Sequence, residues 1–160
     1  MNNSFVYKEA LQYATKKHLG QFRKEGVPYI THPIAVAEIL KKQGFNEEYQ
    51  IAGLFHDLLE DTDATEQEIL TFGGEKVYEA VKLLTKTEGY IMSEYIRNIK
   101  ANPIAFKVKA ADRLHNLQCA VIADEKFRRK YIKESLEWYT DFDDEIPPAI
   151  EALKKTLTSN

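Results

Sequence analysis

The sequence has a single cysteine, Cys119, among its 160 residues. One thiol can form neither a disulfide within the chain nor a zinc site of several thiolates, so we expect Cys119 to be a small buried residue in a reducing compartment. The sequence also lacks a run of 18 apolar residues, and its first thirty residues lack a basic segment followed by an apolar one. We therefore expect no membrane span, no signal peptide and a cytoplasmic protein.

An excess of positive charge is missing as well, because the formal net charge is −3. Such a chain has no general attraction to nucleic acid or to an anionic membrane, so a phosphorylated ligand must be held by local groups. Nothing in the sequence specifies an oligomeric state. The length fits one domain over residues 1–160, which is large enough to bury an ordinary hydrophobic core.

The sequence also lacks the alternation that is typical of strands, since nowhere do four or more residues alternate between β-branched or aromatic and polar residues. We therefore predict an all-α fold. Asn46, the Thr65–Glu68 capping box and Asn102 signal helix starts, and Thr31 or His32 can cap a helix that begins at Pro33. The predicted helices cover about residues 4–18, 33–44, 46–62, 65–73, 75–86, 90–100, 102–117 and 124–142 and the stretch after Pro148.

One predicted helix carries polar residues that packing does not explain. The otherwise apolar stretch Ala52–Thr62 contains His56, Asp57, Glu60 and Asp61. At 3.6 residues per turn, His56 and Glu60 share one line of a helix, and Asp57 and Asp61 share a second line. Burying three carboxylates together is costly unless a positive charge neutralises them, and a divalent cation is the common solution. The stretch therefore indicates a metal site.

A cation at His56 and Asp57 needs further ligands, and His32 and Asp112 are the candidates. His32 stands at a junction between a loop and a helix, and Asp112 lies within a predicted helix. Two imidazoles and two carboxylates suit Mn²⁺, Fe²⁺ or Zn²⁺ and leave coordination positions for water. The other two histidines are interpreted as structural residues (His18 and His115).

These residues and their order resemble the HD superfamily of metal-dependent phosphohydrolases, which is named after its His-Asp doublet. Three segments, 20–33, 54–62 and 107–116, are similar to the hydrolase domain of the RelA/SpoT alarmone enzymes, and especially to its small stand-alone relatives. The resemblance extends from about His18 to Tyr139. It implies an HD-domain helical bundle and Mn²⁺-dependent removal of the 3′-pyrophosphate from guanosine tetra- or pentaphosphate (ppGpp or pppGpp).

The resemblance also implies roles for individual residues in the metal site. The metal ligands of the family correspond to His32, His56, Asp57 and Asp112. Glu60 and Asp61 correspond to an acidic pair that is required for hydrolysis. A carboxylate near the ligands can orient water or take its proton during attack on phosphorus, so the implied roles agree with the chemistry of these residues.

Four further residues are expected to meet the substrate. Arg23 and Lys24 match a basic pair of the family, and they supply the local positive charge that the whole chain does not. Asn116 matches an asparagine that lines the nucleotide pocket. Lys109 lies on the same predicted helix face as Asp112 and Asn116, and we count it among the substrate-binding residues.

Two departures from the family pattern leave the substrate open. Glu25 follows the basic pair where the family usually has a small residue, which places an anion near an anionic substrate, and Cys119 replaces a threonine. The alternative is a phosphohydrolase of the same fold that acts on another nucleotide, such as a nicotinamide dinucleotide phosphate or a nucleoside phosphate. A metal-binding or ligand-sensing module without turnover is a third hypothesis. Glu60 and Asp61 argue against it, since a binding module does not need them.

Overall fold

The structure is a computed structural model, and it describes residues 4–158. The helices are α1 (Phe5–Lys17), α2 (Thr31–Lys42), α3 (Glu47–Phe55), α4 (Leu58–Asp61), α5 (Glu66–Gly73), α6 (Glu75–Leu84), α7 (Met92–Lys100), α8 (Pro103–Cys119), the 3₁₀ helix η1 (Ala120–Ile122), α9 (Glu125–Trp138) and α10 (Ile146–Lys154). No strand occurs between residues 4 and 158, so the all-α prediction is confirmed. None of the helices in this part of the chain is long and apolar enough to cross a membrane.

The predicted start signals act as helix caps, with one exception. The Asn46 side chain accepts from the backbone N–H of Glu48 at 3.1 Å, and Thr65 and Glu68 form both bonds of a capping box. The cap predicted for α2 is wrong, because Thr31 is already helical and its hydroxyl donates to the Pro28 carbonyl. The helix therefore begins two positions before the expected Pro33, and no side chain caps it.

The prediction of one continuous helix from Asn46 to Thr62 is also wrong. α3 ends at Phe55 and α4 begins at Leu58, so His56 and Asp57 occupy the junction between two helices. Apolar periodicity does not reveal this break, because Phe55 and Leu58 on either side of it are both fully buried. The other corrections concern helix ends: α6 ends at Leu84, α7 begins at Met92, α9 ends at Trp138 and α10 begins at Ile146.

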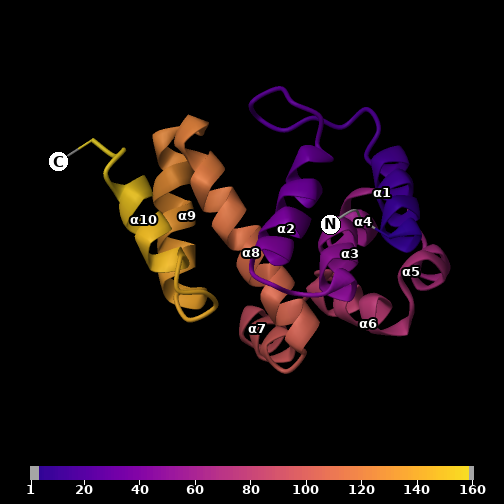
Figure 1. The fold of residues 1–160 in the computed structure, drawn as a ribbon. Helices are drawn as coiled ribbons and strands as arrows, with labels where there is room; N and C mark the ends of the chain where they lie inside the picture. The colour runs from indigo at the N-terminus through magenta and orange to yellow at the C-terminus, as the bar shows by residue number, and fades with distance from the viewer. Residues whose placement is uncertain (1–3, 159–160) are drawn as a thin grey trace.

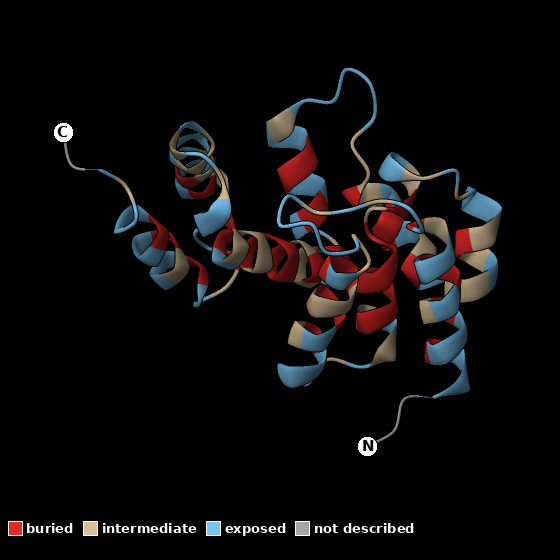
Figure 2. Cartoon of the chain, turned by 90° about the horizontal axis from the view of Figure 1, so that it is seen from above, coloured by how far each residue is buried: buried red, intermediate tan, exposed pale blue. Residues whose placement is uncertain are grey.

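α8 lies at the centre of the molecule. It packs against α2, α3, α6, α7 and α10, and Figure 1 shows it crossing between the N-terminal helices and the α9–α10 pair. The buried residues lie mainly on the faces that the helices turn toward one another, and the exposed residues lie on the outer faces (Figure 2). α8 also buries a carboxylate and a guanidinium among its apolar side chains, those of Asp112 and Arg113. Its centre is therefore the place where a charged site can be enclosed.

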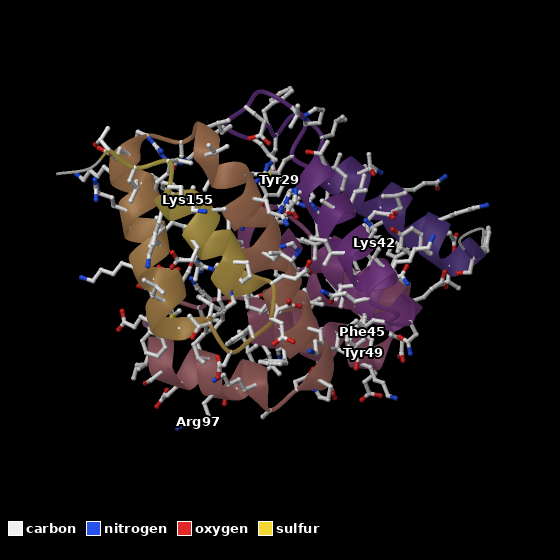
Figure 3. All side chains as sticks on the ribbon, turned by 60° about the vertical axis from the view of Figure 1, so that its left-hand side comes forward. Tyr29, Lys42, Phe45, Tyr49, Arg97 and Lys155 are labelled. Atoms are coloured by element: carbon white, nitrogen blue, oxygen red, sulfur yellow. The ribbon has the colours of Figure 1, made fainter. Side chains whose placement is uncertain are left out.

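The pairing of α2 with α3 brings two distant histidines together. A short connection joins the helices, and near it the rings of Phe45 and Tyr49 stack with centroids 4.7 Å apart (Figure 3). Farther along, Gly53 lets the helices approach, since a Cβ atom there would lie 3.1 Å from Val36 Cγ1. Neighbouring helices with a short connection run antiparallel. The start of α2 with His32 thus meets the end of α3.

Candidate active site

Four of the predicted site residues meet beside the centre of α8. His32 comes from the first turn of α2, His56 and Asp57 from the α3–α4 junction, and Asp112 from α8. Asp112 Oδ1 lies 2.7 Å from His32 Nε2 and 3.2 Å from His56 Nε2, and Asp57 Oδ2 lies 3.1 Å from His56 Nε2. His32, His56 and Asp57 each offer one possible ligand atom, and these three atoms lie within 4.8 Å of one another. The structure thus brings all four candidate ligands together.

The charges of this cluster favour a cation. Burial opposes ionisation of Asp112, but Lys109 and His56 hold its pKa well below the usual value, and His56 likewise lowers the pKa of Asp57 to about 2 against the effect of burial. Burial also opposes protonation of His56, but the two carboxylates raise its pKa well above the usual value. The space between the carboxylates of Asp57 and Asp112 therefore stabilises positive charge. A divalent cation can supply that charge in place of the proton on His56, which is then released.

The orientation of His56 fits metal binding as well. His56 Nδ1 lies 2.6 Å from the carbonyl oxygen of Gly53, and a carbonyl can only accept, so Nδ1 carries a proton. The other nitrogen, Nε2, faces Asp57 and Asp112. Metal-binding histidines commonly hold their second nitrogen in this way. Two imidazoles and two carboxylates arranged so are a donor set for a divalent transition metal.

Two neighbours of the cluster were not predicted as site residues. The Tyr29 hydroxyl donates to Asp57 Oδ2 at 2.5 Å, and His115 Nδ1 lies 2.7 Å from His32 Nδ1. Tyr29 is in the loop before α2 and carries no signal in the sequence that separates it from other loop aromatics. His115, interpreted above as structural, had one available signal, because it lies three residues after Asp112 and so on the same face of α8.

The predicted acidic pair, Glu60 and Asp61, lies on α4, directly after His56 and Asp57. The Glu60 carboxylate accepts from the backbone N–H of Lys86, and the Asp61 carbonyl accepts from the Gln21 side chain at 2.8 Å. Burial, followed by the charges of Asp57 and Glu60, raises the pKa of Asp61 to about 6. Asp61 can therefore gain and lose a proton near neutral pH.

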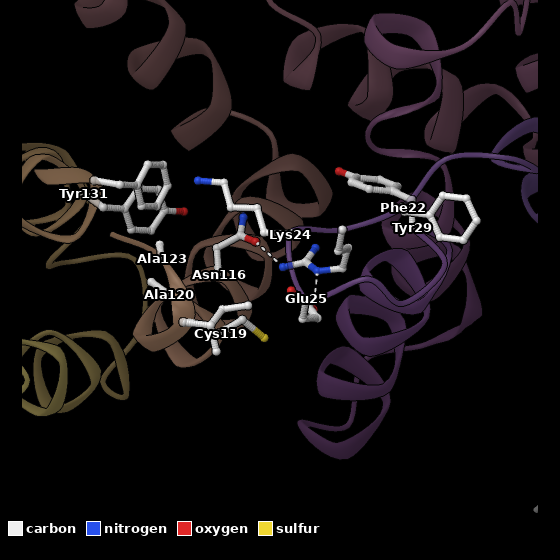
Figure 4. A pocket seen from close by; sticks show the side chains of 12 residues that line it. Phe22, Lys24, Glu25, Tyr29, Asn116, Cys119, Ala120, Ala123 and Tyr131 are labelled. Carbon is white, nitrogen blue, oxygen red and sulfur yellow. Dashed lines mark hydrogen bonds and ion pairs between the residues drawn. The ribbon is translucent and has the colours of Figure 1, made fainter. Parts of the chain in front are cut away.

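A cavity of about 300 Å³ adjoins the cluster. Tyr29 and Asn116 line this cavity and also contact the candidate ligands. Tyr29 donates to Asp57, and Asn116 Nδ2 donates to Asp112 Oδ1 at 3.1 Å. Figure 4 shows Tyr131 on one side of the cavity and Phe22 and Tyr29 on the other. Aromatic walls with a few polar groups are typical of ligand pockets. Because Tyr29 and Asn116 also contact Asp57 and Asp112, a molecule in this cavity would lie close to the candidate ligands.

The loop before α2 places charged groups at this cavity. Arg23 donates through Nη2 to Asn116 Oδ1 at 3.3 Å and through Nε to Glu25 Oε1 at 3.0 Å (Figure 4). Lys24 Nζ lies 3.6 Å from the ring centroid of Phe127, another lining residue. The negative charge of Glu25 is thus offset by Arg23, and the repulsion expected from the sequence is reduced accordingly.

Lys109 and Cys119 occupy positions that the sequence did not indicate. Lys109 is not among the residues that line the cavity; its Nζ atom donates to Asp112 Oδ2 at 3.3 Å and lies 5.7 Å from the ring centroid of Tyr95. The expectation of a buried Cys119 is wrong, since this residue is partly exposed and lines the cavity. Its Sγ atom lies 3.5 Å from His115 Nε2.

Comparison with known proteins gives a consistent picture. A family model described as HD domain matches residues 10–144. A guanosine-3′,5′-bis(diphosphate) 3′-pyrophosphohydrolase of Aquifex aeolicus is 40% identical over 139 residues, which cover 81% of this chain and 20% of that protein. A GTP pyrophosphokinase of Myxococcus xanthus is 34% identical over 148 residues, with 84% and 20% covered. The chain thus spans about a fifth of the length of these curated relatives.

A solved structure resembles the chain over nearly its whole length. It is a metazoan ortholog of SpoT, described as hydrolysing ppGpp, and it matches with a TM-score of 0.78 and 25% identity over 97% of both chains. Together with the family match, this agreement covers the helices that carry the candidate metal ligands and those that line the cavity. The chain therefore belongs to the HD domain family and is homologous to the ppGpp hydrolase domains of the RelA/SpoT enzymes.

Proposed function

We propose that this protein hydrolyses guanosine tetra- and pentaphosphate, releasing the 3′-pyrophosphate, with Mn²⁺ as its metal. One observation carries the proposal: a cluster of two histidines and two aspartates adjoins a cavity that Arg23 and Lys24 line. A nucleotide in the cavity would place a phosphate group between the basic loop and the cluster. Relatives named as pyrophosphohydrolases of guanosine-3′,5′-bis(diphosphate) support this substrate.

His32, His56, Asp57 and Asp112 would hold the divalent cation. The mixed nitrogen and oxygen donors support Mn²⁺, and the HD family implies a divalent metal at this place. When bound, such a cation withdraws charge from a phosphate and makes water more acidic. Tyr29 and Lys109, which bond to the two aspartates, would fix the carboxylate orientations.

The acidic pair would handle the proton of the attacking water. The water oxygen forms a bond to phosphorus, and the bond between phosphorus and the ribose 3′ oxygen breaks. Asp61, whose pKa is raised to about 6, takes the proton that the water loses. Glu60 is tied to the backbone N–H of Lys86 and would orient the water. The 3′ oxygen leaves with the bonding electrons and takes up the proton that Asp61 removed from the water.

The residues of the cavity would hold the nucleotide. Arg23 has donors left besides those used by Glu25 and Asn116, and Lys24 lies above the Phe127 ring, so both can reach a phosphate group. Because Arg23 offsets the charge of Glu25, the main reason to favour another phosphorylated nucleotide is weakened. The role of Lys109 toward substrate stays a prediction, since its Nζ atom bonds to Asp112.

The proposal predicts metal-dependent release of pyrophosphate. Purified protein should bind one divalent ion per chain, lose activity with a chelator and regain it best with Mn²⁺, because four donor atoms converge on one place. Guanosine tetraphosphate should be hydrolysed with a higher kcat/KM than a nicotinamide dinucleotide phosphate or a nucleoside monophosphate. Metal analysis and an assay of released phosphate and pyrophosphate measure both points. Full activity in chelator together with an ion-free protein would refute the metal site.

A second prediction separates the acidic pair from the metal ligands. Asp61→Asn should lower kcat by at least about 100-fold, which is the lower range for loss of a general acid–base group. Glu60→Gln should also lower kcat, because the attacking water is no longer oriented by a carboxylate. Their metal content should stay close to that of the unchanged protein, whereas His56→Ala should lose both metal and activity. If the Asp61 or Glu60 variant sheds the ion, that residue is a ligand and the assigned roles are wrong.

A third prediction concerns the basic loop. Changing both Arg23 and Lys24 to alanine should raise KM for guanosine tetraphosphate at least about tenfold, because each charge-assisted contact contributes roughly 1.5–3 kcal/mol. Lys76→Ala, an exposed substitution on α6, is the control for loss of a positive charge. The circular dichroism spectra should match. An unchanged KM in the double variant would show that the substrate phosphates lie elsewhere.

A further inference from the structure

His115 contacts the candidate ligand His32 on the side away from the metal cluster. The two Nδ1 atoms lie 2.7 Å apart, with the ring centroids 5.0 Å apart and the ring planes 24° from parallel. His32 is 1% exposed, so water does not compete for this contact. On its other side, His32 Nε2 lies 2.7 Å from Asp112 Oδ1. α8 therefore holds both ring nitrogens of His32, one through Asp112 and one through His115.

The short contact between two ring nitrogens requires one proton between them. A neutral imidazole has one N–H and one lone pair, so two Nδ1 atoms at 2.7 Å form a hydrogen bond when one of them donates. For His32 Nε2 to present a lone pair to a cation, the proton of the neutral ring must be on His32 Nδ1. His115 Nδ1 is then the acceptor.

The same reasoning extends to Cys119. With a lone pair on Nδ1, neutral His115 carries its proton on Nε2, and this nitrogen lies 3.5 Å from Cys119 Sγ, a weak acceptor. The hydrogen bonds then point in one direction, from His32 to His115 and from His115 to Cys119. The reverse arrangement would put a proton on His32 Nε2, where it would donate to Asp112 and occupy the nitrogen that a cation needs.

We infer that His115 is a positioning residue that accepts the Nδ1 proton of His32 and so presents His32 Nε2 as a metal ligand. The inference rests on the proposed cation site. Ligating histidines usually donate to a carboxylate, a backbone carbonyl or water, and loss of such a partner typically weakens metal binding about 10–100-fold. Here the partner is a neutral imidazole on the helix that also supplies Asp112, so one element sets two of the four ligands.

The test compares two variants by Mn²⁺ affinity, measured by calorimetry or electron paramagnetic resonance. His115→Leu fills the space without an acceptor and should weaken Mn²⁺ binding about 10–100-fold. His115→Asn keeps an oxygen near the Nδ1 position and should stay within about threefold of the unchanged protein, because the acceptor is retained. Gln118→Leu, at an exposed position of α8, is the control for a polar-to-apolar change on the same helix and should bind Mn²⁺ normally.

The outcomes separate the inference from the function it rests on. Equal Mn²⁺ affinity of His115→Leu and the unchanged protein would refute the role of His115 and leave the cation site intact. An unchanged protein that binds no Mn²⁺ would refute both. If His115→Leu does not fold, ¹⁵N NMR of the Zn²⁺-loaded protein decides instead. The inference requires a proton on His115 Nε2 and a bare Nδ1, and a protonated Nδ1 of His115 would overturn it.

Discussion

The enclosed charge of Asp112 is the constraint on which the site and its surroundings depend. Its carboxylate lies in the middle of α8 with little exposure, 2.7 Å from His32 Nε2 and 3.2 Å from His56 Nε2, and it is stabilised by Lys109 at 3.3 Å. Removing one partner of a buried charge pair typically costs about 3–5 kcal/mol. The contacts that bring the four candidate ligands together thus also hold α2, the end of α3 and α8 together.

Much of the fold can be predicted from local sequence, but the break between α3 and α4 cannot. The capping box of Thr65 and Glu68 depends on residues three positions apart, so the sequence reveals it. The break after Phe55 instead places His56 against Asp112, which lies 56 positions away along the chain. The apolar pattern continues across the break, and periodicity alone therefore predicted a single helix.

The candidate site shows the same division. His56 and Asp57 stood out because an apolar stretch has no packing reason to contain a His-Asp doublet. The need of a cation for further ligands pointed to His32 and Asp112, and resemblance to a known family then implied the roles of the other site residues. Tyr29 and His115 were missed because a loop aromatic and a helical histidine have the same appearance whether they bond to a ligand or to the core. The pairing of Glu25 with Arg23 was missed because a sequence gives charges without side-chain directions. The contact of His115 with His32 forms where α8 packs against α2, and Tyr29 reaches Asp57 at the α3–α4 junction.

The proposed function requires attack of water on phosphorus rather than on carbon. The most direct test is hydrolysis of guanosine tetraphosphate in ¹⁸O-labelled water with Mn²⁺, followed by mass spectrometry of the products. The account predicts equal amounts of guanosine diphosphate and pyrophosphate, with one ¹⁸O atom in the pyrophosphate and none in the nucleotide. Label in the nucleotide, or release of orthophosphate in place of pyrophosphate, would contradict it.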